Sequence, residues 1–96
     1  DWGLFATFAG TGQVCSAGTR LLVQEGVYEE FMKRYLAKIQ NIKVGSGLED
    51  DVMMGPLVSA QHRAKVENYI AIGKQEGAKL VYGGDRPAHL KAGYFL

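Results

Sequence analysis

The residue best suited to covalent chemistry is Cys15, which lies in the segment Gly12-Gln13-Val14-Cys15-Ser16-Ala17-Gly18. A thiolate is a strong nucleophile toward a carbonyl carbon when its pKa and its accessibility are suitable. Small residues flank the sulfur, so a carbonyl group could approach it, and neighbouring backbone N–H groups could face a developing oxyanion. A second interpretation stays open from the residues alone, because a single cysteine in an apolar stretch is often an inert buried side chain.

The two histidines, His62 and His89, are the other candidates for chemistry. Either could pair with Cys15 as in a cysteine hydrolase, although no local pattern favours such a pair. Solvated histidines on a helix surface and in a loop are the simpler interpretation. The histidines and the cysteine lack the spacing of a zinc site. The acidic run Glu49-Asp50-Asp51 likewise lacks the ligand spacing of a calcium loop and indicates a solvated turn.

The elements that would position Cys15 follow from the hydrophobic pattern. Residues 2–9 are apolar and predict the last turns of a helix, which the glycines of Gly10-Thr11-Gly12 interrupt. The short apolar runs 20–24 and 79–82 predict strands of the kind buried on both faces.

Two helices are predicted between these strands. Apolar residues recur with the helical period from Val27 to Ile42, and Ser59 is a good N-cap for a helix that ends at Gly77. Residues 45–56 and 85–92 are predicted loops. Because strands alternate with helices, the sequence predicts an α/β fold, with a mainly parallel sheet and flanking helices.

The composition restricts the partners. Charged residues are 22% of the chain and the net charge is +1, with no basic run, so neither nucleic acid nor an anionic membrane is an expected partner. No apolar segment approaches the roughly 20 residues that span a bilayer. A single cysteine cannot form an internal disulfide, and we therefore expect a reducing, cytoplasmic setting.

The cysteine segment resembles the cysteine signature of the NAD(P)-dependent aldehyde dehydrogenase superfamily. That signature is an aromatic residue, three further residues, Gly-Gln-X-Cys, small residues and an arginine. The positions that fit it are Phe8, Gly12, Gln13, Cys15, Ala17 and Arg20. Further segments resemble the family in the same order, namely Val27-Tyr28-Glu29-Glu30-Phe31, Gly55-Pro56-Leu57-Val58-Ser59, Glu76-Gly77-Ala78-Lys79-Leu80 and Gly93-Tyr94-Phe95. The resemblance covers essentially the whole chain and is nearest to betaine-aldehyde-type members.

The resemblance implies that the parent protein oxidises an aldehyde to a carboxylic acid with NAD or NADP, through a thiohemiacetal and a thioester on Cys15. An acyl-CoA product is a less favoured version of the same chemistry. The resemblance also implies a homo-oligomer. His62 is a candidate cofactor-binding residue, because some relatives have a glutamine at this position that reaches toward the cofactor ribose.

The same resemblance makes residues 1–96 part of the catalytic domain. The cofactor-binding domain, the catalytic glutamate and the oxyanion-hole asparagine are expected outside this chain. An alternative for the isolated chain is a folded, non-catalytic fragment that self-associates. At position 10 the family commonly has asparagine, whereas this chain has glycine. The glycine is expected to loosen the turn that leads to Cys15.

Overall fold

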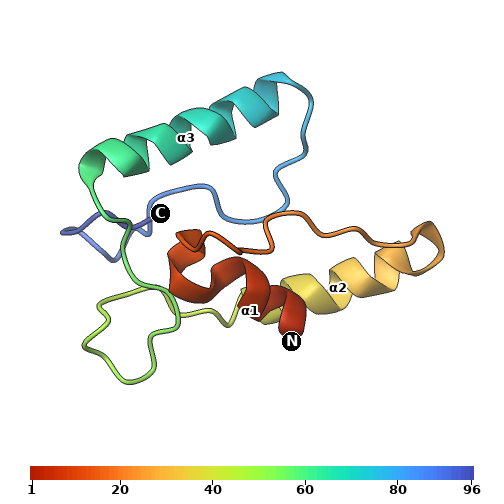
Figure 1. Cartoon of the computed structure of the whole chain (residues 1–96), viewed down its shortest axis with the longest axis horizontal. Helices are drawn as coiled ribbons and strands as arrows, with labels where there is room; N and C mark the ends of the chain where they lie inside the picture. Colours follow the sequence, from red (N-terminus) through yellow and green to blue (C-terminus); the bar gives the residue numbers. More distant parts are fainter.

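Three α-helices and two short 3-10 helices form the regular structure of the computed structural model, which describes residues 1–96 (Figure 1). Helix α1 spans Trp2–Phe8 and continues into η1, Ala9–Gly12. The short η2, Glu25–Val27, leads into α2, Tyr28–Ile39, and α3 spans Ala60–Gln75. None of these helices has the length and apolar content needed to cross a membrane.

Helix α2 forms where the apolar period predicted a helix, although it ends at Ile39 rather than near Ile42. Its apolar stripe is half-buried, and the ring of Phe31 stacks on that of Tyr35 one turn later, with centroids 5.4 Å apart. Glu29 and Glu30 lie in the first turn of α2, where negative charge opposes the positive end of the helix dipole.

Helix α3 has the boundaries that its capping residues predicted. The hydroxyl oxygen of Ser59 accepts a hydrogen bond of 3.1 Å from the His62 N–H, which satisfies one of the free donors of the first turn. Gly77 follows the helix with a φ of 93°, a left-handed conformation that glycine adopts without a Cβ clash. The Ala78 N–H then donates to the Gly73 carbonyl at 2.9 Å and closes the helix end.

The predicted parallel sheet is absent from the structure. Residues 20–24 and 79–82 are irregular, and their backbone groups form no hydrogen bonds to another extended segment. The one β-type pairing is an isolated parallel bridge between Val44 and Met54. The physical reason is that an apolar run permits a strand but does not ensure one. A strand forms only where a neighbouring strand satisfies its backbone N–H and C=O groups. No such neighbour lies beside residues 20–24, where Leu22 is 96% exposed.

The small core lies where the C-terminal segment meets the residues before α3. Leu57 and Phe95 are the buried apolar side chains, with exposed fractions of 7% and 8%. The Leu57 N–H donates to the Tyr94 carbonyl at 3.0 Å, and the Arg63 side chain donates to the Gly93 carbonyl at 3.0 Å. These contacts bind residues 93–95 to the start of α3, along which the end of the chain runs (Figure 1).

An ion pair fastens the loop 85–92 to α3. The Arg86 guanidinium contacts both carboxylate oxygens of Glu67, at 2.5 and 2.9 Å. This fork-to-fork geometry is the strongest form of an arginine–carboxylate contact. The hydrogen bond from Arg86 lowers the pKa of Glu67 below its ordinary value, and the pKa of Arg86 is raised by the same contact.

Candidate active site

Cys15 lies in a tight turn that follows the end of α1. The Ala17 N–H donates to the Val14 carbonyl at 3.0 Å, so Cys15 and Ser16 are the central residues of this turn. Cys15 is a free and exposed thiol. In this chain Cys15 is therefore not a buried cysteine.

The chain reaches the turn through a left-handed stretch. Gly10, Thr11 and Gly12 have φ values of 59°, 61° and 66°. Glycine adopts this region freely, but a β-branched threonine is a conformational outlier there. The Thr11 hydroxyl lies 3.4 Å from the Gly55 carbonyl oxygen, a long contact that links the stretch to the loop before α3.

Glycine at position 10 fits this stretch more closely than a residue with a Cβ would. A Cβ atom at this position would lie 2.8 Å from Cγ2 of Val14, which is closer than real Cβ contacts come. The Gly10 carbonyl accepts the Gln13 N–H at 3.1 Å, so the turn is closed by the backbone.

The chain that leaves the turn is held against α1. The Gly18 N–H donates to the Ala6 carbonyl at 2.7 Å, and the Thr7 hydroxyl lies 3.0 Å from the Gly18 carbonyl oxygen. A Cβ on Gly18 would lie 3.0 Å from the Ala6 Cβ, so a glycine allows this close approach. Hydrogen bonds therefore hold the chain on both sides of residues 14–17, which we call the cysteine turn. The exposed thiol lies between these contacts.

The backbone N–H of Cys15 donates to no other group of the chain. A carbonyl oxygen whose carbon lies against the sulfur could accept a hydrogen bond from this donor, which is the arrangement that stabilises a tetrahedral oxyanion. The turn therefore presents an exposed thiol and one free backbone N–H from the same residue.

Gln13 makes a contact that the sequence did not predict. Its side-chain Oε1 accepts a hydrogen bond of 3.0 Å from the Val58 N–H, across 45 positions of the chain. This bond joins the segment that carries Cys15 to the segment Gly55–Ser59. The only signal in the sequence was the presence of Gln13 within the cysteine motif, which does not name a partner.

His62 and His89 lie outside the cysteine turn. His62 is half-buried in the first turn of α3, and its ring nitrogens make no hydrogen bond within the chain. His89 is exposed in the loop 85–92, where it lines a mainly apolar cavity of about 440 Å³ with Lys43 and Asp85. Neither histidine forms a hydrogen bond with the Cys15 sulfur, so the geometry does not support the cysteine hydrolase hypothesis.

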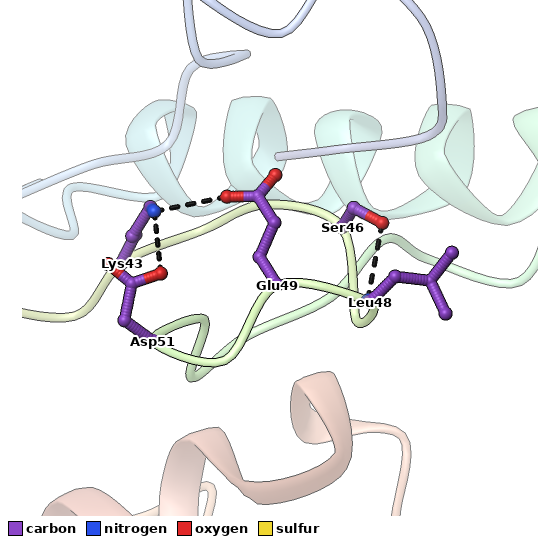
Figure 2. Close-up of polar contacts among 5 residues, drawn as sticks. All are labelled: Lys43, Ser46, Leu48, Glu49 and Asp51. Carbon is purple, nitrogen blue, oxygen red and sulfur yellow. Dashed lines mark hydrogen bonds and ion pairs between the residues drawn. The ribbon is translucent and has the colours of Figure 1, made fainter.

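Lys43 pairs with two of the three carboxylates of the acidic run in the loop 45–56 (Figure 2). Lys43 Nζ lies 3.0 Å from a carboxylate oxygen of Glu49 and 2.7 Å from one of Asp51. The hydrogen bond with Asp51, and next that with Glu49, raises the pKa of Lys43, and the bond with Lys43 lowers the pKa of Asp51. No group of three or more histidine, cysteine or carboxylate side chains converges on a possible metal position.

Comparison with known proteins identifies the relatives of this chain. The protein-family model described as "Aldehyde dehydrogenase family" matches residues 1–96 of this chain. The aminoaldehyde dehydrogenase 2 of Solanum lycopersicum is 44% identical over 96 residues, which are 100% of this chain and 19% of the relative. The betaine aldehyde dehydrogenase of Bacillus subtilis is 47% identical over 97 residues, which are 99% of this chain and 20% of the relative.

Solved structures show the same course of the chain. A crystal structure of betaine aldehyde dehydrogenase from Staphylococcus aureus in complex with NAD+ matches with a TM-score of 0.94 and 41% identity. The match covers 97% of this chain and 19% of that one. The chain thus spans about a fifth of the length of the proteins that it matches.

Proposed function

This chain belongs to the aldehyde dehydrogenase family, and we propose that the protein containing it oxidises an aldehyde to a carboxylic acid through covalent intermediates on Cys15. The observation that carries the proposal is the free, exposed thiol of Cys15 in a backbone-fixed turn. This turn coincides with the segment that resembles the cysteine signature of the family.

The first step is attack of the Cys15 thiolate on the aldehyde carbon. A C–S bond forms, the carbonyl π electrons move to oxygen, and the product is a thiohemiacetal. The backbone N–H of Cys15, which has no acceptor within the chain, is placed to donate to that oxygen. Small neighbours leave room for the substrate, because Ser16, Ala17 and Gly18 carry short side chains or none.

A bound nicotinamide cofactor, NAD or NADP, would accept the hydride that leaves the thiohemiacetal carbon. The remaining acyl group is a thioester on Cys15. Water then attacks its carbonyl carbon, the C–S bond breaks, and the carboxylic acid leaves while the thiol is restored. Both halves of the reaction thus use the same sulfur, which explains why its exposure matters.

His62 is the residue of this chain that we propose to contact the cofactor. Its ring lies on the first turn of α3, is half-buried, and has both nitrogens free of partners within the chain. An imidazole N–H can donate to a ribose hydroxyl, and the neutral ring can also accept. These properties fit the proposed role, which complements that of Cys15 because it concerns binding and not bond formation.

The substrate that we propose is a small polar aldehyde of the betaine aldehyde or aminoaldehyde type. Support comes from the names of the relatives, since the proteins from S. lycopersicum and B. subtilis are called aminoaldehyde and betaine aldehyde dehydrogenases. We also propose a cytoplasmic location, where a reducing environment would keep the Cys15 thiol available.

The test uses the full-length protein that contains this chain. Purified protein should reduce NAD or NADP when supplied with betaine aldehyde, and Cys15→Ala should lower turnover by more than about a hundredfold, because the nucleophile is lost. Titration of the Cys15→Ala protein with the cofactor should give an affinity close to that of the unsubstituted protein. Retention of more than about a hundredth of the activity in Cys15→Ala would show that the chemistry takes place elsewhere.

A further inference from the structure

We propose that Gln13 is a positioning residue that sets the place of the Cys15 thiol relative to the first turn of α3. This inference rests on the proposed function of Cys15. Gln13 lies two residues before the nucleophile, and its Oε1 accepts the Val58 N–H at 3.0 Å. The partner is remote in sequence, so the bond fixes the turn against a different part of the fold.

The attachments of the cysteine turn differ in what they fix. On the exit side, Gly18 is bonded to Ala6 of α1, the helix that itself leads into the turn. This bond closes the loop locally. On the entry side, the contacts of Thr11 with Gly55 and of Gln13 with Val58 both reach the segment before α3. The orientation of the turn toward α3 therefore depends on the entry side.

Of the two entry-side contacts, that of Gln13 is the shorter, at 3.0 Å against 3.4 Å for Thr11. Gln13 is also nearer than Thr11 to Cys15 in the sequence. The residue after its partner is Ser59, whose hydroxyl caps α3 by accepting the His62 N–H at 3.1 Å. Two hydrogen bonds thus connect the cysteine turn with the helix turn that carries His62.

The role of Gln13 is specifically that of a hydrogen-bond acceptor. Its side chain is exposed, so its methylene groups add little to the packing of the core. Removing the acceptor while keeping the length of the side chain should therefore displace the turn without a large loss of packing. A carboxylate at the same position still accepts from the Val58 N–H and should keep the turn in place.

The test compares Gln13→Met, Gln13→Glu and a matched control, Gln75→Met, in the full-length protein. Methionine has nearly the length of glutamine but no oxygen acceptor. Gln75 is exposed at the end of α3 and its side chain makes no hydrogen bond, so it controls for the chemistry of the substitution. The first readout is kcat and KM for oxidation of betaine aldehyde with NAD+.

The second readout needs no cofactor. p-Nitrophenyl acetate acylates a reactive thiol: the Cys15 thiolate attacks the ester carbonyl, the C–S bond forms, and p-nitrophenolate leaves as the C–O bond breaks. The rate of release of the first equivalent reports the placement of the sulfur and its oxyanion donor. It reports neither cofactor binding nor hydride transfer.

We expect Gln13→Met to lower kcat by about ten- to a hundredfold, since a displacement of about 1 Å at a reacting group can cost this much. KM for aldehyde and cofactor should stay within about threefold, because positioning affects the chemical step more than binding. The acylation rate should fall in parallel. Gln13→Glu and Gln75→Met should keep both rates within about threefold of the unsubstituted protein.

Three results would overturn the inference. One is a Gln13→Met protein with both rates unchanged, and another is a Gln13→Glu protein as impaired as Gln13→Met. The third is a loss of melting temperature in Gln13→Met that Gln13→Glu shares, which would indicate a general structural role. If the unsubstituted protein oxidises no aldehyde but its acylation still depends on the Gln13 acceptor, the proposed function fails and the positioning role stands.

Discussion

Gly10 offers the most direct test of how the backbone presents Cys15. Its φ of 59° lies in the left-handed region, and an added Cβ would lie 2.8 Å from Cγ2 of Val14. Substitution of Gly10 by alanine therefore meets two separate penalties. The left-handed backbone costs a residue with a Cβ about 1–2 kcal/mol. Crowding against Val14, which is 42% exposed and can partly shift, costs about 1 kcal/mol, the low end of the cost of overpacking.

We expect Gly10→Ala to lower the free energy of unfolding by about 2–3 kcal/mol, the sum of these two penalties. Gly10→Asn should be milder, because asparagine tolerates the left-handed region while it keeps the Cβ. The matched control is Gly47→Ala, where an added Cβ meets nothing within 4 Å. The control should be neutral or more stable by about 0.4–1 kcal/mol.

Urea unfolding of the full-length variants measures these differences, and a double-mutant cycle separates the two penalties. Adding Val14→Ala removes the Cγ2 atom, so it should recover the crowding part of the Gly10→Ala loss and leave the backbone part. Additive effects, within about 0.5 kcal/mol, would refute the steric contact with Val14. A Gly10→Ala protein as stable as the Gly47→Ala control would refute the left-handed turn itself.

Three further predictions concern α3, its ion pair and the isolated chain. Ser59→Ala should destabilise the protein by about 1 kcal/mol through loss of the N-cap, and Ser59→Asp should restore the melting temperature in thermal scans. The lowered pKa of Glu67 stabilises the fold above the ordinary glutamate pKa, and this stabilisation is lost as the pH falls through the lowered value. The difference in melting temperature between Arg86→Gln and the unsubstituted protein should therefore be present at pH 7 and vanish in acid; a constant difference across pH would contradict the pairing with Glu67. The isolated 96-residue chain should bind no NAD in calorimetric titration and should self-associate in sedimentation, because large apolar side chains such as Leu22 and Trp2 are 96% and 84% exposed. Micromolar cofactor binding, or a stable monomer, would show that the working unit is smaller than proposed.

Several features of this protein follow from short-range sequence signals. The apolar period placed α2, Ser59 and Gly77 placed the ends of α3, and the glycines before Cys15 indicated the break after α1. These signals can be read in the sequence because each acts within about one helical turn. The resemblance of the cysteine segment to the aldehyde dehydrogenases also came from the sequence, and the family match confirms it. The catalytic role of Cys15 and the cofactor contact of His62 stay predictions.

The tertiary structure decided what depends on distant partners. Residues 20–24 have the composition of a strand but no neighbour to pair with, so the apolar pattern alone overpredicted a sheet. The hydrogen bond that Gln13 accepts could not be predicted from the sequence, because its partner Val58 lies 45 positions away. A hydrogen bond of this kind exists only once the chain has brought the two segments together, and no local propensity encodes that meeting. The sequence thus determined which residue carries the thiol, whereas the path of the chain determined what holds that thiol in place.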